Sequence, residues 1–343
     1  MEGAIGETAS LMALRRLAAA IGADSSLVQG AGGNVSIKSG GLLWIKASGT
    51  WLAAAESDDI MVPVELAPGQ TEAFHVPDWH RSGLRPSIET SMHAALPQTV
   101  VLHVHSVDAI ALAVRTDVLP LLEQRLDGLR WAFVPYVRPG LPLAQAVADA
   151  SRGGTADVLI LGNHGLVVAA ESVAAAEALL AQVVDRLSMQ SRATPPASDA
   201  LDALASAIRG SGFTPTADPH THALAIDPHS FAIATGGVLY PDHVVFLGHA
   251  PLVIGPDESF AAALAQHAAA RHEAPKWAIV KGMGVAIADD VARGAAEMVR
   301  CLADVAARIS PGAALSFLGE ADIAELTDWD AEKYRQQLAR TAA

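Results

Sequence analysis

Two histidines lie two residues apart inside a short apolar run, Val100 to His105, and this spacing constrains the fold more than any other feature of the sequence. Successive side chains of a strand point to opposite faces, so residues 103 and 105 point to the same face. Such a strand presents two imidazoles toward a single point. A pair of this kind either forms hydrogen bonds on a sheet face or chelates a metal ion, and the spacing alone leaves both open.

A third histidine and a glutamate favour the metal-binding interpretation. His164 follows a second apolar run, Val158 to Leu161, in a GNHG turn. Glu89 stands upstream, where Pro86 and Ser87 predict the start of a helix. Three neutral imidazoles with an open or carboxylate-filled fourth position are typical of a catalytic zinc site rather than a structural one. The predicted ligands of a divalent ion, with Zn²⁺ as the expected metal, are His103, His105, His164 and Glu89.

These residues belong to a longer ordered series of segments. In chain order the segments are QGAGGNVSIK (Gln29 to Lys38), WIKASGT (Trp44 to Thr50), DDIMVPV, RPSIETSMH, VVLHVHS, VPYVRPGLPLAQAVADA and LILGNHGLVVAAESVAAAEALL. With them the chain resembles the class II aldolase/adducin family over roughly residues 8 to 188. The close spacing of Glu89 and His103, with Pro97 between them, is more similar to the aldolase half of bifunctional rhamnulose-phosphate aldolase/lactaldehyde dehydrogenases than to short fuculose-phosphate aldolases.

The resemblance implies a metal-dependent lyase, a zinc-type aldolase. Such an enzyme reversibly cleaves a ketose phosphate to dihydroxyacetone phosphate and an aldehyde through an enediolate, which a chelating divalent ion stabilises as a Lewis acid. Glu89 is expected to move the carbon-bound proton and also to ligate the resting metal. His93 shares the helix face of Glu89 and matches a recurrent family histidine, and we expect it to support the ligands rather than to bind metal.

Other functions stay open at this point. Epimerases, decarboxylases and dehydratases of sugar phosphates use the same scaffold and the same metal-stabilised intermediate. A non-catalytic adducin-like scaffold protein and a metallohydrolase are alternatives from other classes. Retention of the three histidines and of Glu89 speaks against the scaffold protein, and the GGNVSIK and GNHG segments are not explained by a metallohydrolase.

A phosphate site would use backbone N–H groups at glycine turns and helix N-termini. The positions that match the family's phosphate-binding loops are Gly32, Gly33, Asn34, Ser48, Gly49 and Ser87, and all but Gly32 are taken as substrate-binding candidates. Asn34 could instead be only a left-handed turn residue and Ser87 only a helix cap. Because Ile88 replaces a second hydroxyl of short family members, the expected substrate is a small phosphorylated or otherwise anionic sugar. Lys38 and Lys46 are two of only five lysines that could supply positive charge.

Apolar strands alternate with alanine-rich helical stretches, which predicts an α/β protein. Residues 1–190 are expected to form a three-layer class II aldolase-like catalytic domain with a mostly antiparallel central sheet. Residues 191–200, with two prolines and no apolar period, predict a linker. Residues 201–343 predict a smaller C-terminal α/β domain of unknown role, with strands at 223–226, 231–234, 244–247 and 277–280.

One hypothesis is that the C-terminal domain is a degenerate repeat of the first. The stretch AIVKGMGVAIADDVARGAAEMVRCLADVA repeats the strand, glycine turn, strand and helix of LILGNHGLVVAAESVAAAEALLAQVVDRL, but where the first has His164 it has only Gly282-Met283-Gly284. TGGVLYPDHVVFLG is also distantly similar to SGGLLWIKASG. Such echoes arise easily in α/β chains, so coincidence is the alternative. The C-terminal histidines show no known ligand spacing, which speaks against a second metal cluster.

Composition bounds the partners and the compartment. A net charge of -14 without a visible basic face argues against nucleic-acid binding. No apolar run approaches the roughly 20 residues that span a bilayer, and Arg15 and Arg16 interrupt the N-terminal apolar segment where a signal peptide would have its core. Cys301 is the single cysteine, so an intramolecular disulfide is excluded and the cytoplasm is expected. The resemblance implies a homotetramer with sites between subunits.

Overall fold

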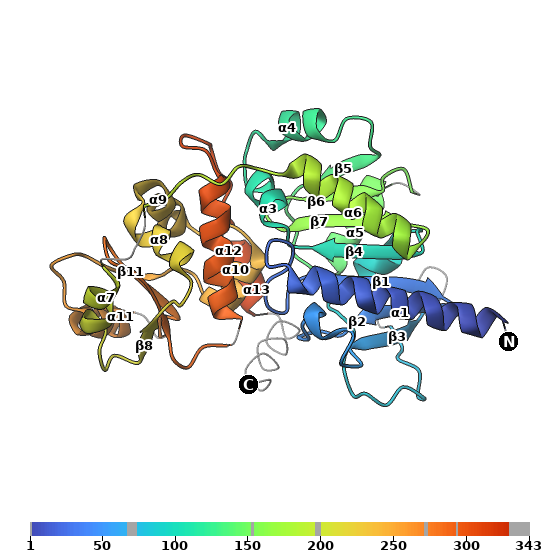
Figure 1. The fold of residues 1–343 in the computed structure, drawn as a ribbon, viewed down its shortest axis with the longest axis horizontal. Coiled ribbons are helices and arrows are strands. Elements are labelled where there is room, and N and C mark those ends of the chain that lie inside the picture. The colour runs from blue at the N-terminus through green and yellow to red at the C-terminus, as the bar shows by residue number, and fades with distance from the viewer. Residues whose placement is uncertain are drawn as a thin grey trace. The chain divides into compact units, whose positions relative to one another are not determined.

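The computed structural model describes residues 2–66, 74–151, 154–195, 200–270, 274–292 and 294–328. The chain divides into two compact units (Figure 1). The first consists of Met1–Ala113 and Asp117–Ser188, and the second of Val114–Thr116 and Met189–Ala343. Residues 196–199 of the predicted linker lie outside the described residues.

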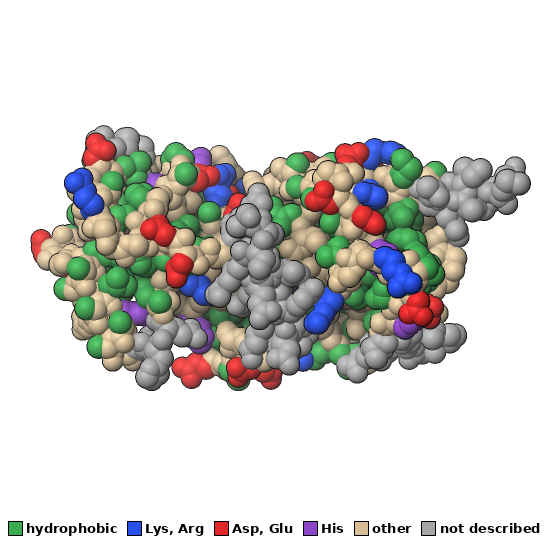
Figure 2. All heavy atoms as spheres, turned by 90° about the horizontal axis from the view of Figure 1, so that it is seen from below, with side chains coloured by type: hydrophobic (Ala, Val, Ile, Leu, Met, Phe, Trp, Pro, Cys, Tyr) green, Lys and Arg blue, Asp and Glu red, His purple; other side chains and the backbone are tan. Residues whose placement is uncertain are grey.

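Two features concern possible partners: the surface charge for nucleic acid, and the length and hydropathy of the helices for membranes. On the face drawn in Figure 2, basic and acidic side chains are interspersed, and the described Lys and Arg residues do not gather into one continuous patch. Among the described helices, none is by itself long and apolar enough to cross a membrane. Helices α9 (Pro228–Gly236) and α10 (Pro241–Leu247) pass that test only together, as a pair bent by 87°. All of α10 is buried, as in the core helix of a folded domain.

A seven-stranded sheet forms the middle of the first unit, with the strand order β3-β2-β1-β4-β7-β6-β5. The strands are β1 (Asn34–Ser39), β2 (Leu42–Lys46), β3 (Met61–Glu65), β4 (Val100–Val104), β5 (Trp131–Val134), β6 (Val158–Leu161) and β7 (Gly165–Ala170). Only β5 and β6 pair in parallel, and the other neighbours are antiparallel. The predicted mostly antiparallel sheet is therefore confirmed.

Helices cover both faces of this sheet. The helices of the unit are α1 (Glu2–Ala23), η1 (Leu52–Ala54), α2 (Thr90–Ala95), α3 (Val107–Ala113), α4 (Val118–Arg125), α5 (Leu141–Ser151) and α6 (Val173–Leu187). Helices α1, α3 and α6 contact β1, β4 and β7 on one face, where they lie in front of the sheet in Figure 1. Helices α2 and α5 pack together on the other face. The result is the predicted three-layer α/β arrangement.

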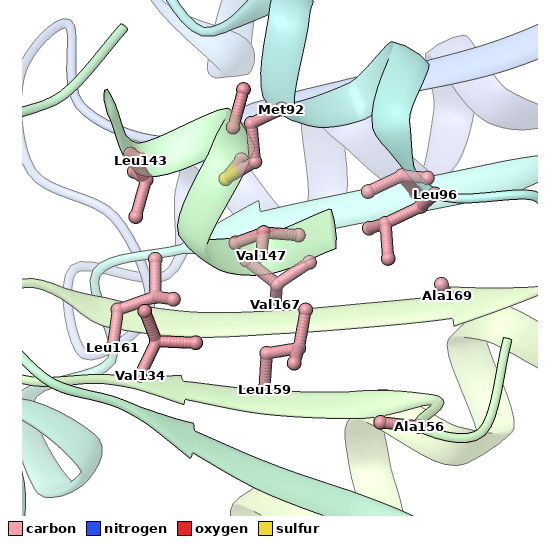
Figure 3. Packing of buried hydrophobic residues seen from close by; sticks show 12 residues of the cluster. Met92, Leu96, Val134, Leu143, Val147, Ala156, Leu159, Leu161, Val167 and Ala169 are labelled. Carbon is pink, nitrogen blue, oxygen red and sulfur yellow. The ribbon is translucent and has the colours of Figure 1, made fainter. Parts of the chain in front are cut away.

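Apolar side chains fix α2 and α5 against the sheet (Figure 3). Alternate residues of β6 and β7 point toward these helices, as the period of a strand requires. The cluster includes Met92, Leu96, Leu143, Val147, Leu159, Leu161, Val167 and Ala169, all buried. Each fully buried large side chain of this kind contributes about 1.5–3 kcal/mol. This packing sets where the first residue of α2 lies relative to the ends of the strands.

The start of α2 differs from the sequence prediction. The helix begins at Thr90, with Glu89 as its N-cap residue, and not at Ser87. The Ser87 hydroxyl accepts a hydrogen bond from the Glu89 N–H (3.2 Å), and the Ser87 carbonyl accepts one from the Thr90 N–H (3.1 Å). Ser87 therefore closes a separate turn just before the helix.

The second unit has a smaller, four-stranded sheet with the order β8-β11-β10-β9. Its elements are α7 (Leu201–Ala207), β8 (Phe213–Pro215), η2 (Pro219–His222), α8 (Ala223–Ile226), α9, α10, β9 (Leu252–Ile254), α11 (Phe260–Ala270), β10 (Trp277–Val280), β11 (Gly284–Ala288), α12 (Ala295–Arg308) and α13 (Glu320–Thr327). A smaller C-terminal α/β domain is thus confirmed, and β10 lies where the sequence predicts a strand.

Three predicted strands of this unit are wrong. Residues 223–226, 231–234 and 244–247 lie in α8, α9 and α10. Pro228 and Pro241 occupy first-turn positions of helices, where proline is favoured, and Asp227 caps α9 by accepting from the Ser230 N–H. Short apolar runs do not distinguish a strand from a buried helix, and these caps decided the outcome. The similarity of residues 235–248 to the β1–β2 hairpin fails for the same reason.

Candidate metal centre

Strand β4 brings His103 and His105 to the centre of the first unit. His103 lies opposite Asn34 of β1 and Val167 of β7, and it has no solvent exposure. Its Nδ1 lies 3.1 Å from the Leu166 carbonyl oxygen, which can only accept. Nδ1 therefore carries the proton, and Nε2 carries the lone pair with which a neutral imidazole binds a metal. That Nε2 lies 3.1 Å from Nε2 of His105.

The β6–β7 turn adds the third imidazole. Asn163 has φ of 52° and is the only non-glycine residue with positive φ in the described ranges. The His164 N–H donates to the Leu161 carbonyl (3.1 Å), which closes the turn. The His164 ring then lies 4.9 Å from the ring of His103 and 5.3 Å from that of His105, measured between centroids.

Glu89 completes the cluster from the start of α2. Its Oε2 lies 3.4 Å from Nε2 of His103, its Oε1 lies 3.5 Å from Nε2 of His164, and the Asn34 amide donates to Oε2 at 2.8 Å. Burial by itself raises the pKa of Glu89, but the three imidazoles and the Asn34 hydrogen bond outweigh it and lower the pKa to about 2. The carboxylate is therefore ionised at neutral pH.

The spacing of these four side chains fits a divalent metal ion. The three histidine ligand atoms lie within 4.8 Å of one another, and all three side chains are buried. Bonds of about 2.1 Å in a tetrahedral site separate neighbouring ligand atoms by about 3.4 Å. The contacts of 3.1, 3.4 and 3.5 Å among the imidazoles and the carboxylate lie close to that value. The structure therefore brings together the whole predicted ligand set.

The glycine-rich loop places Gly33 and Asn34 next to this cluster. Gly33 has φ of 60°, and a Cβ on it would lie 2.9 Å from the His103 carbonyl oxygen, so only glycine fits without a shift. Asn34 is 4% exposed. Its amide nitrogen holds Glu89, while its Oδ1 has no hydrogen-bond partner among the described residues. A buried acceptor of this kind is a natural contact for a ligand donor.

Ser48, Gly49 and Ser87 lie on two adjoining segments. The Ser48 N–H donates to the Arg85 carbonyl (2.9 Å), and the Ser87 N–H donates to the Lys46 carbonyl (3.1 Å). These two backbone donors are therefore engaged within the protein. The buried Ser48 hydroxyl has no partner in the described part of the chain, and Gly49 turns with φ of 76°. The side chain of Ser48, rather than its backbone, is the group left for a ligand.

The two lysines do not supply a basic patch. The Lys46 ammonium is almost fully buried and donates to the carbonyls of Ala31 (2.9 Å) and Thr50 (2.7 Å). It ties the glycine-rich loop to the turn that carries Ser48. Lys38 donates to the carbonyls of Leu96 and Gln98, and burial lowers its pKa to about 8 against the opposing effect of Glu171. Both lysines position backbone.

Two supporting contacts have only weak signals in the sequence. The Gln29 amide donates to the carbonyls of Ser25 (2.7 Å) and His105 (3.3 Å). Nδ1 of His93 lies 2.7 Å from the Ser36 hydroxyl. Ser36 stands two residues after Asn34 on β1, and His93 stands four residues after Glu89. Same-face spacing and the family match of His93 were the signs of this pair in the sequence.

Three converging imidazoles beside an ionised carboxylate form a site that could hold a divalent ion, as in the catalytic sites of metal-dependent enzymes. The family model described as the class II aldolase and adducin N-terminal domain matches residues 14–191. The chain belongs to this family, as the sequence motifs predicted.

Relatives differ in how much of their length is matched. An uncharacterized oxidoreductase of Bacillus subtilis, YuxG, is 30% identical over 44% of this chain, and the chain spans only 25% of that protein. An L-fuculose phosphate aldolase of Methanococcus maripaludis is 29% identical over 44% of this chain and 79% of its own length. A solved class II aldolase domain of Thermoplasma acidophilum is 27% identical, covers 50% of this chain and 88% of that chain, and has a TM-score of 0.42.

Proposed function

We propose that this protein is a metal-dependent class II aldolase, a carbon-carbon lyase that reversibly cleaves a ketose phosphate to dihydroxyacetone phosphate and an aldehyde. The convergence of His103, His105, His164 and Glu89 on one point inside the family's domain carries this proposal. The fuculose phosphate aldolases among the relatives support a sugar phosphate as substrate.

We propose that the three histidines and the resting Glu89 hold Zn²⁺. Nitrogen ligands with one carboxylate suit this ion, and a zinc site built from several thiolates is excluded because the chain has a single cysteine. When bound, the ion supplies Lewis-acid stabilisation of the negative charge that develops on the ketone and neighbouring hydroxyl oxygens of the substrate. The His103 ring is held in the required tautomer by the Leu166 carbonyl.

Glu89 is the group that we assign to proton transfer at carbon. In the synthetic direction its carboxylate removes a proton from the hydroxylated carbon beside the ketone, and in cleavage it returns that proton to the same carbon. Its ionised state suits the base role, and the Asn34 amide fixes one oxygen so that the other faces His164. Burial excludes bulk water from the transferred proton.

The substrate is proposed to be a small phosphorylated or otherwise anionic sugar bound by Gly33, Asn34, Ser48, Gly49 and Ser87. The unpartnered Ser48 hydroxyl and Asn34 oxygen support this choice for the described residues. We further propose residues 1–190 as the catalytic domain, 191–200 as a linker and 201–343 as a further domain, in a cytoplasmic homotetramer that binds neither nucleic acid nor membrane.

The test is a cleavage assay on the zinc-loaded protein with a panel of ketose 1-phosphates, read as dihydroxyacetone phosphate released. Glu89→Gln is expected to lower turnover at least about 100-fold, the range of general acid-base catalysis, and to retain the metal. Glu171→Gln, which changes an exposed carboxylate, serves as the matched control. Inversion of the sugar without cleavage would replace the aldolase by an epimerase. If the protein retains no divalent ion after it has been incubated with zinc, the non-catalytic adducin-like scaffold would be favoured.

A further inference from the structure

We infer that the second unit is a duplicate of half of the first unit, in which the metal centre has been erased and its place filled by His222. This inference goes beyond the proposed function, because it concerns the unit in which the described residues form no candidate ligand set. Strand order is the first observation. The order β8-β11-β10-β9 reproduces β4-β7-β6-β5, and the three pairings are antiparallel, antiparallel and parallel in both sheets.

Most helices stand at corresponding places along the chain, and the exception is the segment with α4 before β5 in the first unit and with α9 and α10 before β9 in the second. Helix α2 precedes β4 as α7 precedes β8, and α3 follows β4 as η2 and α8 follow β8. Helix α5 connects the parallel strands β5 and β6 as α11 connects β9 and β10, and α6 follows β7 as α12 follows β11. A mixed sheet with the same connections in the same order is much more specific evidence for duplication than one repeated strand-turn-helix motif.

Register places individual residues in correspondence. Gly165 starts β7 opposite Leu161, and Gly284 starts β11 opposite Val280. Two residues into each of these strands, β7 faces His103 and β11 faces Pro215. Pro215 therefore occupies the register position of the first metal ligand.

Hydrogen bonds of the turn recur as well. The Asn163 N–H donates to Ala113 (3.2 Å), and the Gly282 N–H donates to Ala225 (2.9 Å) at the end of the corresponding helix. Both donor residues are left-handed, with φ of 52° and 76°. The His164 N–H reaches back to Leu161 (3.1 Å) just as the Met283 N–H reaches back to Val280 (2.9 Å). Met283 thus occupies the position of His164.

None of the corresponding positions can bind a metal through a nitrogen or carboxylate. Pro215, Ala217 and Met283 stand in place of His103, His105 and His164, and the N-cap of α7 is Ala200 where α2 has Glu89. A thioether is a poor ligand for zinc, and the other side chains carry no donor atom. The second copy has kept its scaffold and lost its ligands.

In the second unit, other side chains fill the space that corresponds to the candidate metal site. The contacts of the two equivalent glycines, Gly165 and Gly284, identify these side chains. A Cβ on Gly165 would lie 3.4 Å from the His105 ring and 3.5 Å from the His103 ring. A Cβ on Gly284 would instead lie 2.5 Å from Nδ1 of His222 and 2.9 Å from the Leu204 side chain. An imidazole from the following helix and a leucine from the preceding one occupy the side of the turn on which the ligands lie in the first copy.

His222 is bound on both ring nitrogens. Nδ1 accepts from the Val285 N–H (3.0 Å), and Nε2 donates to the Thr216 carbonyl (3.1 Å). The side chain is 1% exposed. With one nitrogen protonated and the other engaged by a backbone donor, no lone pair remains for a cation, so His222 acts as a hydrogen-bonded plug. The chain is therefore expected to hold one metal ion, in the first unit.

A ligand graft tests the correspondence in the full chain. Pro215→His, Ala217→His and Met283→His are combined with His222→Ala, and Co²⁺ is titrated into metal-free wild type and graft with visible absorption as the readout. The graft is expected to bind one equivalent more than wild type. This difference does not depend on the first site, so a wild type that binds no metal would end the proposed function and leave the duplication standing. A folded graft, checked by circular dichroism, that binds no more than wild type would overturn the duplication.

A second variant keeps the inference testable if the graft does not fold. His103→Ala with His105→Ala removes ligands of the first unit only and leaves the second unit unchanged. If wild type binds one equivalent and this variant none, the second unit holds no metal, as inferred. A wild type with two equivalents, or a variant that retains one, would show that the second unit binds metal and would overturn the inference.

Discussion

At the scale of single residues, the centre depends on two buried groups on one helix face, of which one is charged and the other is neutral. Glu89 is ionised because three imidazoles and the Asn34 amide surround it. His93 is neutral, because burial and the neighbouring His103 lower its pKa to about 3. Asn34 holds Glu89 and Ser36 holds His93, so two residues of β1 fix α2 and its N-cap residue. The His93 contact is therefore expected to position Glu89.

Replacement of His93 tests this positioning role. His93→Leu leaves the buried Ser36 hydroxyl without its partner, a cost of about 1–3 kcal/mol, and removes one of the two ties on α2. We expect metal affinity to fall about 10-fold, since one such tie is worth about 1.4 kcal/mol. His93→Asn, whose amide can replace Nδ1, should keep most of the affinity. Competition with a metal-binding dye measures both variants, and equal losses in both would contradict the role.

At the scale of elements, the site depends on how closely β7 approaches β4. A Cβ on Gly165 would lie 2.6 Å from the Val104 carbonyl oxygen, a distance that real contacts do not show. The glycine therefore allows the β6–β7 turn to place His164 next to the strand that carries the other two histidines.

Elements of the second unit carry buried titratable groups as well, above all His243 on α10.

Gly165→Ala is expected to push β7 away from β4. We expect a loss of unfolding free energy of about 1–3 kcal/mol, the usual cost of overpacking, together with weaker metal binding. Urea unfolding and metal titration measure the two effects. Gly255→Ala is the matched control, because its Cβ would meet only ordinary contacts of 3.9 Å or more. Unchanged metal affinity in the Gly165 variant would contradict the account of the turn.

The second unit is expected to lose stability in mild acid. Burial lowers the pKa of His243 from 6.5 to about 4, and neither ring nitrogen has a hydrogen-bond partner among the described residues. The unfolded chain takes up this proton below about pH 6.5, whereas the folded chain takes it up only near pH 4. The stabilisation is therefore complete above pH 6.5 and falls between pH 6.5 and 4 by at most about 3 kcal/mol.

Urea unfolding at pH 7.5 and 4.5 measures this loss. His243→Leu carries no titrating ring and should show a smaller difference between the two pH values than wild type. The rings of Tyr240 and Trp277 lie 5.8 and 6.2 Å from His243, so the leucine remains in an apolar site. Equal differences in wild type and variant would assign the acid sensitivity to other groups.

At the scale of the whole molecule, one scaffold occurs twice, with three converging imidazoles in the first copy and the hydrogen-bonded His222 ring in the second. Metal binding should therefore stabilise the chain only through the first copy. At a free Zn²⁺ concentration 1,000-fold above the dissociation constant, the native state gains about 4 kcal/mol. Thermal unfolding with zinc and with a chelator measures the shift. His103→Ala should abolish most of it, while His222→Asn should leave it intact, and a response that survives His103→Ala would place the metal elsewhere.

Local spacing made much of the candidate site predictable. The separation of two residues put His103 and His105 on one strand face, and the GNHG turn identified His164. The same local rules misassigned α8, α9 and α10, because a short apolar run has no period that separates a buried helix from a strand. They also named Lys46 among the lysines that could supply positive charge, whereas its ammonium donates to two backbone carbonyls.

By itself, the sequence determined which side chains could bind a metal, the strand faces on which neighbouring ones lie and the family, because these depend on residue type and on short-range backbone geometry. Only the tertiary structure decided that Glu89 lies beside the three imidazoles, with its carboxylate oxygens 3.4 Å from His103 and 3.5 Å from His164. It also decided that His222 occupies the corresponding place in the second unit. Distance along a chain does not fix distance in space, and the charge of a buried group is set by the neighbours that folding brings to it.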